Sequence, residues 1–132
     1  MIYLDANIFI YPNTGEGAKS GACITILNKV IKNEMQAGTS VLTWDEVHYA
    51  LQKEIGKEKA TEQSKELFTM PNLALFGADI KTIESAQQIV EKYNLKPRDA
   101  IHVATAILNN CVEIISDDSD FDRIRELKRI KL

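Results

Sequence analysis

Short apolar runs alternate along this chain with longer segments in which apolar residues recur at helical spacing. Runs of about four residues predict strands buried on both faces, as in a parallel sheet. These runs lie at residues 2–5, 40–43, 73–76 and 112–115, and residues 129–132 could add a fifth strand. The alternation predicts an α/β fold, with a parallel sheet of four or five strands that helices cover on both faces.

The segments between the runs predict helices. The first reaches from about residue 20 to residue 36, where Gly38 supplies the stop, and polar, turn-forming residues precede it from Pro12 to Gly21. Residues 58–69 are mostly charged and predict an exposed helix. None of these segments suggests a linker, so we expect a single domain over residues 1–132.

Three further helices have recognisable starts. Thr43 or Asp45 could cap one, Asp79 begins the next, and Pro97 suits the first turn of the last. In the helix after Thr43, the expected apolar stripe is Val47, Ala50, Leu51 and Ile55. After Asp79, the residues expected to face inward are Ile80, Ile83, Ala86, Val90 and Tyr93. After Pro97, they are Ile101, Ala104, Ile107 and Leu108.

Composition indicates little beyond the cellular compartment. The chain has 132 residues, a formal net charge of −3 and two cysteines, Cys23 and Cys111, without the spacing of a disulfide framework. A reducing, cytoplasmic compartment is the simplest interpretation. The first residues resemble no signal peptide, and no apolar run approaches the roughly 20 residues of a membrane span, so we expect a soluble protein.

Four acidic clusters lie far apart in the sequence, each where a strand should end or a helix should begin. They contain Asp5, Glu46, Asp99 and the pair Asp118 and Asp120. Carboxylates among apolar residues are costly to bury unless a cation neutralises them. Because right-handed crossovers bring the carboxyl ends of parallel strands to one edge, these acids could share one pocket there.

Oxygen ligands of this kind favour Mg²⁺ or Mn²⁺, which can activate water for hydrolysis of a phosphodiester. Asp5 and Asp118 are the expected direct ligands, and Asp99 would bind directly or through water. Glu46 would orient or deprotonate the attacking water. Asn7 and Ser116 would hydrogen-bond these acids and orient them.

Each acid also has a local explanation. Asp5 suits a turn after a strand, and Glu46 and Asp99 suit the first turn of a helix, where the helix dipole favours acids. His102, three residues after Asp99, shares its helical face and could touch substrate, but a structural histidine is the commoner case. Arg98 is the basic residue best suited to contact an RNA phosphate.

Read in order, the segments LDANIFIY, TWDEVHYAL, LKPRDAIHVATAI and ISDDSDFDRI resemble the motifs of the PIN domain, and most closely those of the VapC-type ribonuclease toxins. The resemblance covers nearly the whole chain. It implies a three-layer α/β/α fold and a magnesium- or manganese-dependent ribonuclease. It also implies homodimers and inhibition by a partner antitoxin.

Asp5, Glu46 and Asp99 match the acidic positions of this family. In the last motif, Ser116, Asp118, Asp120 and Phe121 fit the pattern and leave Asp117 as the variable position. The resemblance therefore favours Asp118 as a metal ligand, with Asp120 as a supporting one.

The sequence thus predicts a metal-dependent endoribonuclease, the toxin of a toxin–antitoxin pair. Two alternatives stay open. The chain could be an inactive relative that binds RNA or a partner protein. It could also be a receiver or phosphatase-like domain in which Asp5 accepts a phosphoryl group, although Glu46 and Asp99 would then have no task.

Overall fold

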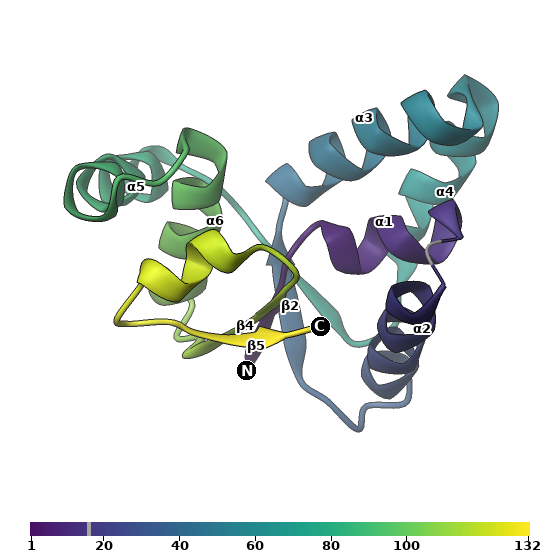
Figure 1. The fold of residues 1–132 in the computed structure, drawn as a ribbon, viewed down its shortest axis with the longest axis horizontal. Coiled ribbons are helices and arrows are strands. Elements are labelled where there is room, and N and C mark those ends of the chain that lie inside the picture. Colours follow the sequence, from purple (N-terminus) through teal and green to yellow (C-terminus); the bar gives the residue numbers. More distant parts are fainter. Residues whose placement is uncertain (16) are drawn as a thin grey trace.

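The computed structural model describes residues 1–15 and 17–132 and has a parallel five-stranded sheet at its centre (Figure 1). The strands are β1 (Ile2–Leu4), β2 (Ala37–Ser40), β3 (Leu73–Phe76), β4 (Glu113–Ser116) and β5 (Lys128–Lys131). Their order across the sheet is β3-β2-β1-β4-β5, and every neighbouring pair is parallel. The predicted parallel sheet is confirmed, with five strands.

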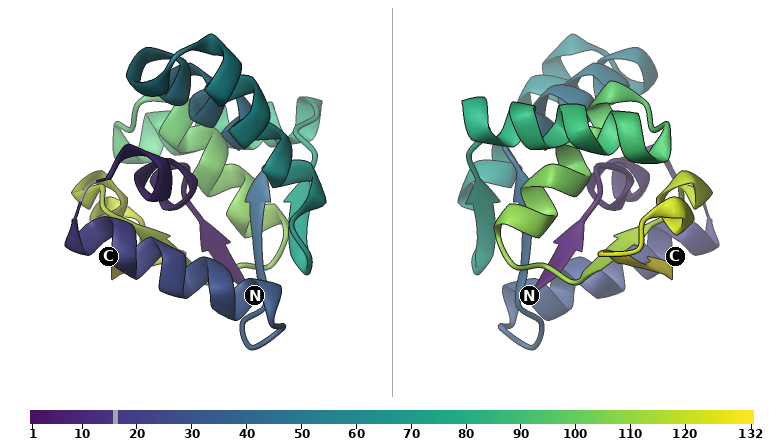
Figure 2. Two further views of the ribbon diagram at one scale, coloured as in Figure 1. Left: turned by 90° about the vertical axis from the view of Figure 1, so that its right-hand side faces the viewer. Right: turned by 90° about the vertical axis from the view of Figure 1, so that its left-hand side faces the viewer.

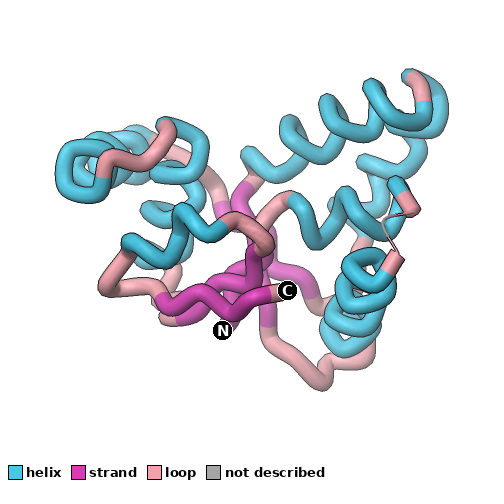
Figure 3. The backbone as a smooth tube through the Cα atoms, viewed as in Figure 1, coloured by secondary structure: helices cyan, strands magenta, loops and turns pink. Residues whose placement is uncertain are grey.

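Helices cover both faces of this sheet, as the tube view makes clear (Figure 3). The helices are α1 (Asn7–Thr14), α2 (Ala18–Ile31), α3 (Leu42–Ile55), α4 (Lys57–Thr69), α5 (Ile80–Tyr93) and α6 (Pro97–Leu108), with a short 3₁₀ helix η1 (Ser119–Arg123). In Figure 1, α1 to α4 lie on one side of the strands, and α5, α6 and η1 lie on the other. The fold is the expected three-layer α/β/α sandwich.

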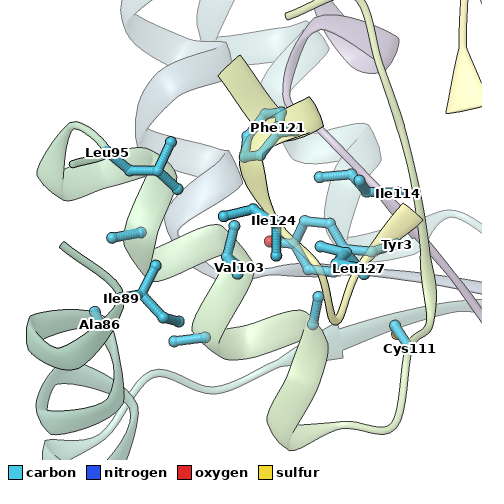
Figure 4. Close-up of a cluster of buried hydrophobic side chains, with 13 residues drawn as sticks. Tyr3, Ala86, Ile89, Leu95, Val103, Cys111, Ile114, Phe121, Ile124 and Leu127 are labelled. Carbon is cyan, nitrogen blue, oxygen red and sulfur yellow. The ribbon is translucent and has the colours of Figure 1, made fainter. Parts of the chain in front are cut away.

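Two clusters of buried apolar side chains join the layers because successive strand residues point to opposite faces. Tyr3 of β1 and Ile114 of β4 pack with α5, α6 and the segment around η1 (Figure 4). Their neighbours Leu4 and Ile115 pack against helices α1 to α4 on the other face. The central strand β1 is therefore covered on both faces by apolar side chains.

The strand order reverses between β1 and β4. The chain fills the sheet outward from β1 through β2 to β3, then crosses to the other side of β1 to form β4 and β5. Both β1 and β2 run away from the end of the sheet where the N-terminus lies (Figure 2). In open α/β sheets the ligand crevice lies outside the carboxyl ends of the strands that flank such a reversal. Asp5 and Ser116 stand at those two ends.

The second strand lies three residues earlier than predicted. Residues 40–43 were expected to form it, and Gly38 was expected to stop a helix. Instead Gly38 lies inside β2, paired with Tyr3 and Ala74, and α2 ends at Ile31. The helical spacing of apolar residues continued beyond the helix to Met35, a loop residue that packs against the same buried cluster. Helix α3 consequently begins at Leu42 without a side-chain cap, and Glu46 lies in its second turn, not its first.

The predicted turn before the first helix is also partly wrong. Residues 7–14 form α1 with Pro12 inside it, and α2 begins at Ala18. Position 16 of that predicted turn lies outside the described residues. Proline tends to break helices, and this tendency hid the element in the sequence.

Two predicted inward faces were wrong in part. In α5, Ile80 and Ile83 are exposed, at 76% and 50%, whereas Ala86 and Ile89 are buried. In α6, Leu108 is exposed by 38%, and the continuous run from His102 to Ala106 is buried. Helix α6 lies so deep in the fold that its buried face is wider than a single apolar stripe.

No helix in residues 1–15 and 17–132 combines the length and hydropathy needed to cross a membrane.

Candidate metal-dependent nuclease site

Asp5 directly follows β1 and is held by hydrogen bonds from three sides. Ser116 Oγ donates to its Oδ2 over 2.6 Å, the amide of Ala6 donates to Oδ1 over 2.8 Å, and Asn7 Nδ2 approaches Oδ2 at 3.4 Å. The residue is only 8% exposed. Burial raises the pKa of Asp5, while His102 and the Ser116 hydrogen bond oppose the rise. Asn7 and Ser116 thus contact the acid that they were predicted to orient.

The loop after β4 brings two more acids to the same edge. Ser116 Oγ accepts from the amide of Asp118, and Asp118 Oδ1 accepts from the amide of Asp120 at 2.9 Å. Asp118 thereby caps the η1 helix, which explains why the chain turns sharply here. The same Ser116 hydroxyl therefore links the strand ends that carry Asp5 and Asp118.

Asp99 lies in the first turn of α6, two residues after Pro97. Partial burial and then the nearby carboxylates Asp118 and Asp5 together raise its pKa to about 6, while the charge of His102 opposes the rise. A carboxyl that is electrostatically crowded in this way is a typical cation ligand or acid–base group.

Glu46 reaches the edge from α3 and meets His102 of α6. Its Oε1 lies 2.9 Å from His102 Nε2, and the other ring nitrogen, Nδ1, lies 2.6 Å from the hydroxyl of Tyr3. Burial lowers the pKa of His102, but the Glu46 hydrogen bond and the charges of Glu46, Asp5 and Asp99 raise it more, so the net shift is upward.

The acids form two adjacent groups, each with ligand atoms within 4.8 Å of one another. One contains Asp5, Glu46 and His102, and the other contains Asp99, Asp118 and Asp120. A cavity of about 630 Å³ spans them, lined by Glu46, Asp99 and Asp118 together with Lys96, Pro97 and Arg98. Residues from three distant parts of the sequence therefore line one cavity, and Asp5 lies beside Glu46 in the adjoining group.

The charge of this pocket is poorly balanced by basic side chains. Within residues 1–15 and 17–132, no lysine or arginine forms an ion pair with Asp5, Glu46, Asp99 or Asp118. Arg123 approaches Asp120 at 3.4 Å. In addition, Asn7 Oδ1 is buried with no hydrogen-bond partner among the described atoms. Carboxylates without a lysine or arginine partner, together with an unpaired amide oxygen, suit a hard divalent cation.

Two other residues of these motifs, Asp117 and Arg98, bond to residues outside the pocket. Asp117 accepts hydrogen bonds from Tyr11 and Lys19, on the other side of the sheet. Arg98 lines the cavity, but its guanidinium pairs with Asp45 at 3.3 Å, at an exposed position.

Sequence reasoning undervalued three residues near the site. His102 was expected to be a structural histidine, and it is fully buried, but it also contacts Glu46. Tyr3 was not singled out, although it precedes Asp5 by two residues. Arg129, from β5, was also missed, and it donates to the carbonyl of Ser116 while it pairs with Asp122. The spacing of His102 from Asp99 was the only signal in the sequence.

Comparison with known proteins identifies the fold. A family model described as the PIN domain matches residues 2–127. Ribonuclease VapC2 of Methanocaldococcus jannaschii is 26% identical over 141 aligned residues, which cover 99% of this chain and 93% of that protein.

Solved structures have the same architecture. VapBC2 from Rickettsia felis, bound to a fragment of its promoter DNA, superposes with a TM-score of 0.75 at 20% identity, over 99% of this chain and 98% of that one. Mycobacterium tuberculosis VapC20, a toxin that cleaves the sarcin–ricin loop, superposes with a TM-score of 0.75 at 13% identity, over 92% and 93%. Since the family model spans nearly the whole chain and the fold agrees, this chain belongs to the PIN domain family.

Proposed function

We propose that this protein is a Mg²⁺- or Mn²⁺-dependent endoribonuclease and the toxin of a toxin–antitoxin pair. The observation that carries the proposal is the convergence of Asp5, Glu46, Asp99 and Asp118 at one edge of the sheet, where the last three line one cavity, without lysine or arginine partners among the described residues. The similarity to ribonuclease VapC2 supports RNA as the substrate.

The carboxylates would have two roles, to hold the cation and to activate the attacking water. Asp5, Asp99 and Asp118 would hold the cation, with Asp120 supporting Asp118 through its backbone amide. Bound there, a divalent cation would neutralise the acids and polarise the scissile phosphate. Glu46 would orient the attacking water and accept its proton. Asn7 and Ser116 would keep Asp5 in place through their hydrogen bonds.

Arg98 would bind an RNA phosphate at the rim of the cavity. Its guanidinium is exposed, and its present partner Asp45 is also on the surface, so the pair can open at low cost. The alternative in which Asp5 accepts a phosphoryl group is disfavoured because Ser116, Ala6 and Asn7 already surround its carboxylate.

The test is metal-dependent cleavage of an RNA panel by the purified chain, with Asp5→Asn and Asp99→Asn as variants. We expect cleavage with Mn²⁺, none with EDTA, and losses of about 100-fold or more in each variant. Asp117→Asn is the matched control, because it removes a charge from the same motif but from a side chain that contacts Lys19.

Calorimetric titration with Mn²⁺ adds a readout that needs no RNA. The variants should bind Mn²⁺ more weakly than the native chain, and Asp117→Asn should bind it equally well. Should the native protein bind Mn²⁺ but cleave no RNA, the alternative of an inactive RNA- or partner-binding relative would replace the enzyme. Equal cleavage by native protein and both variants would refute the role of the acids.

The proposal also includes an antitoxin partner, a homodimer and a cytoplasmic location. The VapBC neighbours support an antitoxin partner for this chain. The exposed Ile80 and Ile83 of α5 favour a homodimer, because large apolar side chains at adjacent turns of one helix often mark an interface. Two buried free cysteines suit a single cytoplasmic domain.

A further inference from the structure

A buried chain of hydrogen bonds runs from the middle of the sheet to Glu46. The amide of Ser40, the last residue of β2, donates to the Tyr3 hydroxyl at 3.0 Å. That hydroxyl lies 2.6 Å from His102 Nδ1, and His102 Nε2 lies 2.9 Å from Glu46 Oε1. Four elements, β2, β1, α6 and α3, contribute one residue each. We call these residues the relay.

The proton positions in the relay follow from its two ends, a backbone amide and a carboxylate. A backbone amide can only donate, so the Tyr3 oxygen accepts from Ser40. A phenol hydroxyl both accepts and donates, so it can donate its own proton to Nδ1 at 2.6 Å. The carboxylate oxygen of Glu46 accepts, so His102 Nε2 carries a proton whether the ring is neutral or charged. Nε2–H then donates to Glu46.

This geometry restrains one oxygen of Glu46 and leaves the other available. Tyr3 and His102 are both fully buried, with their rings in edge contact at 5.7 Å between centroids. Glu46, by contrast, lines the cavity. Among the described residues, hydrogen bonds to its side chain reach only Oε1. The relay therefore connects the buried side chains of Tyr3 and His102 to Glu46, whose side chain faces the cavity.

We propose that Tyr3 and His102 are positioning residues that hold Glu46 in its working orientation, an inference that rests on the proposed RNA cleavage. His102 is then a hydrogen-bond donor to Glu46 and not a metal ligand, although it lies beside Asp5. A nitrogen that carries a proton has no lone pair to offer a cation. Partners at this distance from the chemistry often change rates by one or two orders of magnitude.

The test compares Tyr3→Phe, His102→Leu and His102→Gln in RNA cleavage with Mn²⁺. Tyr3→Phe and His102→Leu should lower kcat by about tenfold or more with little change in KM, because Glu46 loses its fixed orientation. His102→Gln keeps an N–H donor and should recover part of the rate. Tyr93→Phe is the matched control, since it removes a hydroxyl that bonds Glu126 at an exposed position.

A double-mutant cycle separates positioning from general loss of structure. Once Glu46→Ala has removed the side chain, adding Tyr3→Phe should not slow cleavage further. If the two substitutions instead multiply, or if Tyr93→Phe slows cleavage as much as Tyr3→Phe, the relay does not act through Glu46 and the inference is wrong.

Nitrogen-15 NMR of the His102 ring tests the relay without RNA. In native protein at a pH where His102 is neutral, the proton should reside on Nε2, and Tyr3→Phe should reduce that preference. An Nε2–H ring in a protein that cleaves no RNA would reject the proposed function but not the hydrogen-bonded relay. An Nδ1–H ring in an active enzyme would overturn the relay and retain the function.

Discussion

Asp99 illustrates how one residue of this site differs from its counterpart in a short peptide. The sequence placed it at the start of a helix, where an acid is normally stabilised by the helix dipole. The structure adds partial burial and the carboxylates Asp118 and Asp5, and together these raise the pKa to about 6. Ionisation of Asp99 therefore destabilises the folded, metal-free protein.

This shift predicts a pH-dependent stability. Since folding raises the pKa of Asp99 above its ordinary 3.8, its contribution to stability is present below about pH 4 and is lost as pH rises through about 6. Asp99→Asn should therefore stabilise the metal-free protein at pH 8 but not at pH 4. After allowance for solvent screening, we expect a gain on the order of 1 kcal/mol in urea denaturation with EDTA.

Asp117→Asn is a control of opposite sign. The Lys19 hydrogen bond lowers the pKa of Asp117, so its stabilising contribution is present at pH 8 and is lost as pH falls through the lowered pKa. The substitution should thus lower the free energy of unfolding at pH 8. A gain for both variants, or for neither, would contradict the electrostatic explanation.

At the scale of elements, β2 decides where Glu46 stands. Residues 37–40 form the strand, and α3 follows with only Val41 between them. The amide of Leu42 donates to Ser40 Oγ, and the amide of Val41 donates to the carbonyl of Phe76. The tight connection brings the second turn of α3 over the strand ends, where Glu46 meets His102.

Glycine at position 38 allows β2 to pack beside β3. An added Cβ would lie 2.4 Å from Phe76 Cε2 and 3.1 Å from the carbonyl oxygen of Ala74. Gly38→Ala should therefore lower the free energy of unfolding by about 1–3 kcal/mol, because the Phe76 ring must move away and the Ala74 carbonyl must shift slightly to admit the methyl group. Chemical denaturation in urea measures the change.

Gly21→Ala provides the comparison within the same chain. Gly21 lies inside α2, and a Cβ there would have no contact within 4 Å. Alanine should stabilise the helix by about 0.5–1 kcal/mol. If both substitutions had the same effect, crowding at Gly38 would not be the cause.

For the whole molecule, the main electrostatic problem is how an acidic protein would bind RNA. The formal net charge is −3, and the pocket itself collects carboxylates. Under the proposed function, attraction to phosphates would come from local basic residues at the rim and from the proposed cation in the centre. Lys96 and Arg98 are the basic residues that line the cavity.

Arg98→Ala tests that arrangement. We expect weaker RNA binding, a salt dependence whose logarithmic slope falls by about 0.7–1, and an unchanged single-turnover rate at saturating RNA. Lys32→Ala is a suitable control, because Lys32 follows α2 near the opposite edge of the sheet. Fluorescence anisotropy at several salt concentrations measures both. Equal slopes for native protein and Arg98→Ala would exclude a phosphate contact.

Local patterns in the sequence determined the class of fold and the set of acids. Alternating apolar runs predicted the parallel sheet, and the position of Asp5 after a strand and of Asp99 after Pro97 followed from local rules. The motifs also identified the family. These features depend on neighbours within a few residues, where backbone preferences and side-chain spacing act directly.

Only the tertiary structure decided the register of β2, the existence of α1 and the relay. Strand boundaries depend on partners: Gly38 is in a strand because Tyr3 and Ala74 pair with it. Likewise, His102 bonds residues 56 and 99 positions away, and nothing near it in the sequence reports those contacts. Packing across the sheet selects such pairs, so the acids could be predicted singly but the hydrogen bonds that orient them could not.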